Sequence, residues 1–256
     1  MKGLRLVYMG SVLCFLYIPI FILVLFSFNK ATFSTDWEGF SLQWYTKLFQ
    51  NQDLLEVTLN SLWLAISSAS LSTVFSAVLA ILFFRFRLPA QSFLKGTLYS
   101  LLMAPDLVLG ISLLILFLAI GLDLGYLSLL IAHITFCIPF CFLTIAARMQ
   151  SFDPSILEAA LDLGASQFQT YTRILFPILK PALLSAWMLA FTLSMDDVIV
   201  SFFVSGPSYE VLPLKIYSMV RFGVKPEVNA LCSLLLLMTL VLLFLSHRLI
   251  NSKEVR

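Results

Sequence analysis

The sequence predicts an all-α integral membrane protein with six transmembrane helices. Of its 256 residues, 60% are hydrophobic and only 12% are charged, and the mean hydropathy is +0.98. Soluble domains carry about 25% charged residues, so this composition is typical of a protein embedded in a bilayer. Segments of about ten residues with alternating polarity, which build membrane β-barrels, do not occur in the sequence.

Charge-free stretches locate the six helices. Four stretches of at least 20 residues contain no Asp, Glu, Lys or Arg, and two more are interrupted only by acidic residues. About 20 apolar residues allow an α-helix to cross the roughly 30 Å hydrocarbon core. We therefore expect one membrane domain, residues 1–256, with spans at about 6–28, 59–84, 98–120, 126–146, 182–204 and 229–247.

The distribution of basic residues predicts the orientation. With the N-terminus inside, eleven of the 16 Lys and Arg residues fall in inner segments and five in outer ones. Inner loops of membrane proteins carry the excess of Lys and Arg, so both termini and the polar segment 153–177 are expected on the cytoplasmic side. Lys2 and Arg5 precede an apolar run too long for a cleaved signal peptide, which favours a retained anchor.

The second span carries small residues at every fourth position, namely Ser68, Ser72, Ser76 and Ala80. Small residues let helix backbones approach closely in lipid, so we expect this helix to pack inside the bundle. Pro105 and Pro139 lie within the third and fourth spans, where each predicts either a bend beside a cavity or a plain structural kink.

The polar segment 153–177 begins with the signals of a short helix. Asp153 is a favourable N-cap, and Pro154 suits the first helical position because its missing N–H costs nothing there. Gly164 then stands where a left-handed residue ends a helix.

A second helix is expected after this glycine. Ser166 and Gln169 form a capping-box pattern, and Pro177 is expected to end or kink the helix that follows. The result is a compact helix–Gly turn–helix outside the bilayer, a shape suited to insertion into a cleft on another protein.

Three carboxylates lie inside predicted spans, at Asp106, Asp196 and Asp197. Each costs on the order of 3 kcal/mol in a bilayer, so three in one small bundle need a reason. On a continuous helix Asp196 and Asp197 point about 100° apart, and Asp197 shares a face with Ser194 and Ser201. We therefore expect Asp197 to line a polar path more directly than Asp196, with Asp106 as a second station. The alternative is that these acids are protonated or only fix helix packing.

The chemistry of the path favours a cation. No Lys or Arg lies inside a predicted span to neutralise the acids, so a positively charged substrate would supply the missing charge. Phe202, Phe203 and Tyr209 could add cation–π contacts. The sequence has no P-loop, no catalytic constellation and no metal-ligand set, so no bound cofactor or metal and no nucleic acid is expected.

The spacing E-A-A-x3-G-x9-I-x-L-P within 153–177 resembles the cytoplasmic loop of permease subunits in binding-protein-dependent (type I) ABC importers. Phe176 replaces the Leu of that pattern and keeps the position apolar. The resemblance implies a coupling loop that docks on an ATPase subunit. The matching positions are Glu158, Ala159, Ala160, Gly164, Ile174 and Pro177.

The string from Ser194 to Pro207, followed by Leu212-Pro213-Leu214, resembles the second permease subunit of spermidine/putrescine importers. The resemblance implies a bacterial inner-membrane transporter subunit without a catalytic site of its own. It also implies a companion permease, two copies of an ATPase that binds ATP–Mg, and a periplasmic polyamine-binding protein. In such a system polyamine enters the cytoplasm by alternating access.

Other functions remain open from the residues alone. The same kind of importer could carry iron, a vitamin or an oxyanion, although uncompensated carboxylates disfavour an anion. An intramembrane aspartyl protease could use Asp106 and Asp197, but it leaves the segment 153–177 unexplained. An uncoupled channel or a scaffolding subunit leaves the same segment unexplained.

Overall fold

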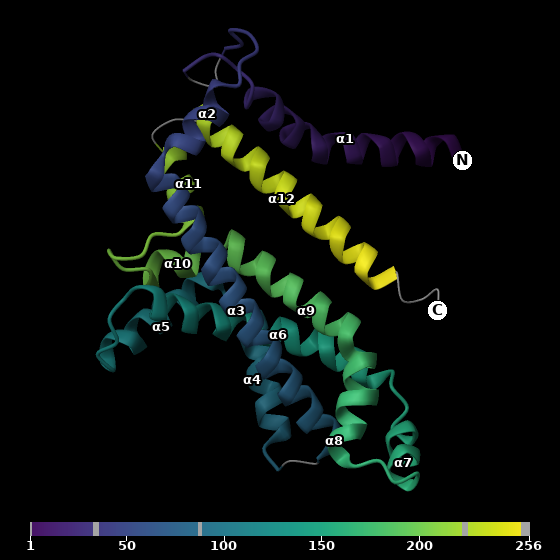
Figure 1. The fold of residues 1–256 in the computed structure, drawn as a ribbon. Coiled ribbons are helices and arrows are strands. Elements are labelled where there is room, and N and C mark those ends of the chain that lie inside the picture. Colours follow the sequence, from purple (N-terminus) through teal and green to yellow (C-terminus); the bar gives the residue numbers. More distant parts are fainter. Residues whose placement is uncertain (1, 33–35, 87–88, 222–224, 252–256) are drawn as a thin grey trace. The chain divides into compact units, whose positions relative to one another are not determined.

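The computed structural model describes residues 2–32, 36–86, 89–221 and 225–251, and these are almost entirely helical (Figure 1). Within them the only strand-like pairing is an isolated bridge between Asn29 and Phe40. The all-α prediction is therefore confirmed. The helices are α1 (Lys2–Phe26), α2 (Gln43–Gln50), α3 (Gln52–Arg85), α4 (Gln91–Met103), α5 (Asp106–Ala119), α6 (Tyr126–Gln150), α7 (Ser155–Asp162), α8 (Gln167–Thr170), α9 (Phe176–Asp196), α10 (Ile199–Val204), α11 (Leu212–Arg221) and α12 (Pro226–Asn251).

Four described helices are long and apolar enough to cross a membrane: Arg5–Phe26, Gln52–Arg85, Tyr126–Gln150 and Gln167–Asp196. The pair α4 and α5 makes a fifth crossing if it is counted as one broken span. In α12 the described apolar part, Pro226–Val241, is shorter. The count of six spans therefore stays a prediction.

The chain divides into two compact units, Met1–Val57 with Lys215–Arg256 and Thr58–Leu214, which we describe separately. In the first unit, α12 packs against α1 and α2. The buried Asn29 organises the loop before α2: its side-chain amide donates to the Asp36 carbonyl at 2.6 Å, and its own carbonyl accepts from Trp44 Nε1 at 2.8 Å. The predicted single domain, 1–256, is not tested by this division.

The centre of the second unit is the pairing of α6 with α9. Small side chains let the two helices approach closely. The Cys141 thiol lies 3.4 Å from the Ala186 carbonyl oxygen, and the Cys137 thiol lies 3.6 Å from that of Ala190. Close approach of this kind is how helices associate in lipid, where the hydrophobic effect does not drive them together.

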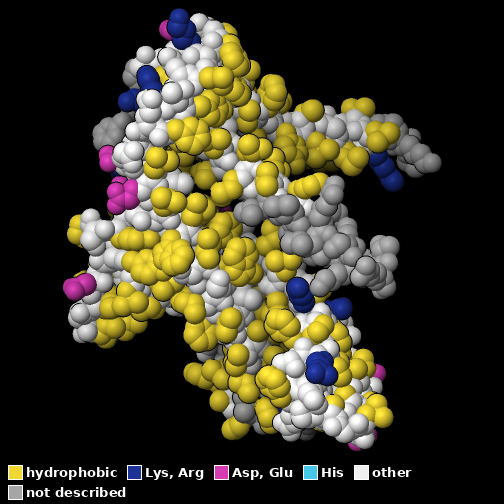
Figure 2. Space-filling model, in the orientation of Figure 1, with side chains coloured by type: hydrophobic (Ala, Val, Ile, Leu, Met, Phe, Trp, Pro, Cys, Tyr) yellow, Lys and Arg dark blue, Asp and Glu magenta, His cyan; other side chains and the backbone are white. Residues whose placement is uncertain are grey.

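The small residues of α3 face this pair, as the sequence predicted. Ser68, Ser72, Ser76 and Ala80 are all buried. The hydroxyl of Ser68 bonds to that of Ser194 at 3.1 Å, and the hydroxyl of Ser76 donates to the Ile138 carbonyl at 3.0 Å. The opposite face of α3 exposes large apolar side chains such as Trp63 and Val74. Hydrophobic side chains also cover much of the face of the molecule shown in Figure 2.

Ser72 and Ser76 provide a matched pair for testing this packing. Ser72 Oγ is buried and has no hydrogen-bond partner, whereas Ser76 Oγ has one. We expect Ser72→Ala to leave the thermal unfolding midpoint of the purified complex unchanged or higher, because it removes an unpaired buried hydroxyl. Ser76→Ala should lower the unfolding midpoint, because it costs about 1 kcal/mol of unfolding free energy. Ser72→Leu should lower the midpoint through overpacking. A lower midpoint for Ser72→Ala would contradict this assignment.

The two intramembrane prolines behave differently. At Pro105 the chain bends by 115° between α4 and α5, so residues 98–120 do not form one straight helix. Pro139 instead lies inside the continuous helix α6. The predicted bend is therefore confirmed at Pro105, whereas at Pro139 the helix continues without a break.

Helix α5 crosses α10 at Gly110. A Cβ at Gly110 would lie 2.8 Å from Phe203 Cδ2 and 3.3 Å from Val200 Cα, so a larger residue here would require Phe203 and α10 to shift. Leu113, Phe117 and other apolar side chains fill the rest of the contact. The crossing fixes the position of α10, and α10 begins directly beside two of the predicted site residues.

Candidate functional site

The predicted N-cap of the segment 153–177 is confirmed. The Asp153 carboxylate accepts a hydrogen bond from the Ser155 N–H at 2.9 Å, and helix α7 begins at Ser155. This backbone hydrogen bond, followed by one from the Ser155 hydroxyl, lowers the pKa of the Asp153 carboxyl. The carboxylate thus stays charged beside the positive end of the helix dipole.

Gly164 ends α7 in the left-handed conformation that the sequence predicted, with φ of +85°. Its N–H donates to the Leu161 carbonyl at 2.9 Å, and the Ala165 N–H donates to the Ala160 carbonyl at 3.0 Å. These two bonds form a Schellman motif, which satisfies the last carbonyls of the helix.

The capping box is also confirmed, because the Ser166 N–H donates to Gln169 Oε1 at 3.0 Å and the Gln169 N–H donates to Ser166 Oγ at 3.3 Å. The expectation that Pro177 ends the helix is wrong, whereas the expected kink stays a prediction. Residues Gln167–Asp196 run as one helix, and a π-helical turn at Tyr171–Leu175 precedes the proline. A π turn contains one extra residue and shifts the backbone hydrogen bonds, which accommodates a residue without an N–H.

The surface of this segment is open to contact. Glu158, Ala159, Gly164 and Pro177 are exposed, Ile174 is half-buried, and Ala160 packs inward. Two large apolar side chains project outward, Leu163 with 90% and Phe168 with 76% of its surface exposed. A cleft of about 510 Å³ lies between α7 and the end of α3.

The three intramembrane carboxylates lie around one pocket. Asp106, Asp196 and Asp197 all line a cavity of about 480 Å³ among α4, α5, α6, α9 and α10. Asp106 comes from the first turn of α5, directly after the bend at Pro105. The bend therefore brings a residue far away in sequence to the same pocket as Asp196 and Asp197. No Lys or Arg lines this pocket.

The helix is broken at the two adjacent acids. Helix α9 ends at Asp196, Asp197 is extended (φ −69°, ψ 121°), and α10 begins at Ile199. The sequence analysis treated 182–204 as one continuous helix, so its assignment of faces does not hold across Asp197. Ser194 lies on α9 and Ser201 on α10, and both are buried without lining the pocket.

His133 joins these separated residues. Its Nδ1 lies 2.7 Å from Ser194 Oγ, and its Nε2 lies 3.1 Å from Ser201 Oγ and 3.8 Å from Asp197 Oδ2. The sequence predicts only a packing role for Ser68, and His133 is not among the predicted site residues. The available signal was an ionisable residue inside a span, which is costly in lipid and marks a functional position by default.

The aromatic side chains at the pocket differ from those expected. Phe136 and Phe140 of α6 line it. Phe203 packs against Phe202, and Tyr209 donates to the Asn60 carbonyl at 2.8 Å. The expected cation–π partners Phe202, Phe203 and Tyr209 are therefore not among the residues lining the pocket.

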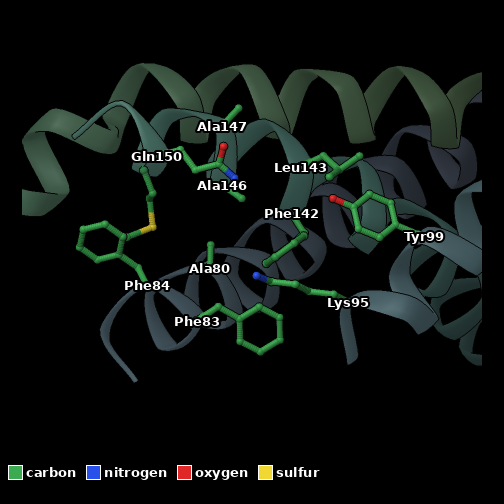
Figure 3. A pocket seen from close by; sticks show the side chains of 11 residues that line it. Ala80, Phe83, Phe84, Lys95, Tyr99, Phe142, Leu143, Ala146, Ala147 and Gln150 are labelled. Atoms are coloured by element: carbon green, nitrogen blue, oxygen red, sulfur yellow. The ribbon is translucent and has the colours of Figure 1, made fainter. Parts of the chain in front are cut away.

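A second pocket, of about 550 Å³, lies among α3, α4 and α6 (Figure 3). It is lined mainly by apolar side chains, and its one charged residue is Lys95, whose Nζ is 5.7 Å from the centre of the Phe83 ring. A basic residue in an apolar cavity repels a cation. Among the described residues, no group of three or more His, Cys, Asp or Glu could hold a metal ion.

Comparison with known families decides the class of protein. The model of the family described as "Binding-protein-dependent transport system inner membrane component" matches residues 72–254. The chain belongs to this family. It is therefore a multi-pass inner-membrane component of a transport system, not an enzyme, and the family match covers both the segment 153–177 and the carboxylate pocket.

Curated relatives of this transport component are similar over nearly its whole length. The spermidine/putrescine transport system permease protein PotC of Escherichia coli (strain K12) is 47% identical over 96% of this chain and 93% of its own. The protein of the same name from Haemophilus influenzae is 46% identical over 95% of each. The putrescine transport system permease protein PotI of Escherichia coli (strain K12) is 38% identical over 87% of this chain and 82% of its own.

Solved structures support the fold of the transport component. The crystal structure of a bacterial ABC transporter involved in the import of alginate aligns with a TM-score of 0.73, covering 98% of this chain and 95% of that chain at 15% identity. The MetNI methionine ABC transporter aligns with a TM-score of 0.59 at 17% identity, covering 79% of this chain and 98% of that chain. At these identities the likeness concerns the fold alone.

Proposed function

We propose that this chain is a permease subunit of an ABC importer that moves polyamines, spermidine or putrescine, into the cytoplasm. The observation that carries the proposal is the 47% identity, over 96% of the chain, to a permease named for spermidine/putrescine transport. In this proposal the chain forms part of an alternating-access pathway. ATP hydrolysis takes place in a separate ATPase subunit.

The carboxylate pocket supports a cationic cargo. Polyamines carry several ammonium groups at neutral pH, and Asp106, Asp196 and Asp197 line a pocket without Lys or Arg. Opposite charges attract more strongly where water is scarce, so three acids in a membrane pocket favour the passage of ammonium groups. Phe136 and Phe140 add aromatic faces to the same pocket, and these can contact an ammonium group by cation–π attraction.

The segment 153–177 supports an ATPase partner. Its helix–Gly turn–helix projects exposed Leu163 and Phe168 beside the exposed Glu158. We propose that this segment inserts into a cleft on one of two ATPase copies, with a companion permease and an extracytoplasmic polyamine-binding protein completing the importer. Both termini would then face the cytoplasm, as the Lys and Arg distribution favours.

Uptake into proteoliposomes tests this function. The vesicles would contain this chain with its companion permease and ATPase, together with the binding protein and labelled spermidine or putrescine. We expect uptake that requires both ATP and the binding protein. Absence of polyamine uptake, combined with ATPase stimulation by another solute, would keep the importer and reject the cargo.

A further inference from the structure

We infer that Asp196 is the carboxylate that contacts the cation, and that Asp197 and His133 are positioning residues that hold the break between α9 and α10. The division of roles rests on the proposed function, because it names the residue that meets its cargo. It reverses the order expected from a continuous helix. The two carboxylates, Asp196 and Asp197, differ in whether their oxygen atoms already have hydrogen-bond partners within the protein.

The Asp197 carboxylate accepts three hydrogen bonds within the protein. Its Oδ1 accepts the Val200 N–H at 3.2 Å, and its Oδ2 accepts the Ser201 N–H at 2.7 Å and the Ser201 hydroxyl at 2.8 Å. Only 10% of its side chain is exposed. A substrate cation would have to compete with three hydrogen bonds and with His133 for these oxygens.

These hydrogen bonds satisfy N–H groups that have no backbone partner because the helix is broken. Residues Val200 and Ser201 lie in the first turn of α10, where N–H groups have no partner within the helix. In a membrane each unsatisfied N–H costs several kcal/mol, so the Asp197 carboxylate makes the break possible. Its role at this position is therefore structural.

His133 fixes the cap against α6. The Ser201 hydroxyl donates to Asp197, which leaves its oxygen to accept from His133 Nε2–H. The other ring nitrogen, Nδ1, then accepts from the Ser194 hydroxyl. With a neutral imidazole, each ring nitrogen has one partner, as the donor and acceptor inventory of histidine requires. The buried ring thus ties the end of α9 and the start of α10 to the same point on α6.

Asp196 has the opposite character. Its side chain is exposed and lines the pocket, and no other described residue bonds to its carboxylate. It is the last residue of the 21-residue helix α9, where the negative end of the helix dipole adds to its charge. Asp196 thus presents to the pocket a carboxylate that no other described residue engages, where the local potential attracts a cation.

Exchange and uptake measured on the same complexes separate the two roles. In the assembled complex in lipid, Asp197→Asn and His133→Asn should speed hydrogen–deuterium exchange at Val200 and Ser201 about tenfold or more, as expected for loss of a charge-assisted hydrogen bond. Asp196→Asn should leave that exchange unchanged and reduce polyamine uptake about tenfold or more, as expected for loss of a close charged contact.

Conservative variants sharpen the test. Asp196→Glu should recover much of the uptake, because a free carboxylate tolerates a longer side chain. Asp197→Glu should not restore slow amide exchange, because a carboxylate held by three fixed hydrogen bonds does not tolerate a longer side chain. In His133→Gln the side-chain N–H can lie about where the Nε2–H of His133 lies. This variant should therefore protect the Val200 and Ser201 amides from exchange better than His133→Asn. Thr135→Val, near His133 but only half-buried and with its hydroxyl bonded to the Ile131 carbonyl within α6, is the control and should change neither measurement.

The inference fails if Asp197→Asn leaves amide exchange at Val200 and Ser201 unchanged. It also fails if, relative to the Asn variant at the same position, Asp197→Glu restores uptake and Asp196→Glu does not. If the wild-type complex takes up no polyamine, the proposed cargo is wrong. The exchange comparison then still decides whether Asp197 and His133 hold the break.

Discussion

Gly164→Pro is expected to abolish ATP-driven uptake while the protein still inserts into the membrane. Gly164 has φ of +85°, and its N–H donates to Leu161. Proline is restricted to φ near −65° and has no N–H, so the turn between α7 and α8 cannot form without a cost of about 3 kcal/mol or more. The orientation of α7 relative to α8 would change, and with it the surface proposed to meet the ATPase.

Gly121→Pro is the matched control. Gly121 also has a positive φ, +70°, and its N–H also donates three residues back, to Leu118 at 3.2 Å. A Cβ at either glycine would meet nothing within 4 Å. Both variants therefore carry similar local strain, and only Gly164→Pro should uncouple ATP hydrolysis from uptake. Equal uptake by the two variants would refute the docking role of 153–177.

Gly206→Ala is expected to prevent stable assembly. A Cβ at Gly206 would lie 2.5 Å from the Leu124 carbonyl oxygen and 2.7 Å from the Leu124 carbonyl carbon. Backbone atoms cannot move aside as side chains do, so overpacking adds about 1–3 kcal/mol. The left-handed backbone, with φ of +66°, adds about 1–2 kcal/mol more. Thermal unfolding and size-exclusion profiles of the purified complex measure this loss.

Gly121→Ala separates the two contributions. It has nearly the same backbone angle as Gly206 but open space around the added methyl group. It should therefore carry only the smaller, left-handed cost and remain assembled. If Gly206→Ala is as stable as Gly121→Ala, the close approach between Gly206 and Leu124 does not contribute to the fold.

Local signals in the segment 153–177 predicted its structure well. Asp153, Gly164 and the Ser166–Gln169 pair act through hydrogen bonds to residues within about five positions, so they work in any tertiary setting. Pro177 does not end its helix, because a π turn at Tyr171–Leu175 precedes it and accommodates the missing N–H. Capping and turn signals in the sequence do not predict this π turn.

The candidate pocket shows where local reasoning fails. Pro105 and Pro139 carry the same local signal, yet only the first interrupts its helix. The break at Asp197 follows a sequence without Gly or Pro. It exists because Asp197 bonds to the start of α10 and Gly110 lets α5 cross α10 closely. Neither interaction can be read from the residues that flank the break.

Composition and local motifs were enough to predict the membrane class, the approximate positions of the apolar helices and the shape of the segment 153–177. They also located the three acids inside the bundle. That Asp106 shares a pocket with Asp196 and Asp197, and that Asp197 lies beside His133, is visible only in the folded chain. The difference lies in the sequence separation over which each interaction acts. Apolar content, capping and glycine turns act within a few residues, whereas His133 and Ser68 meet Ser194 across 61 and 126 positions of the chain.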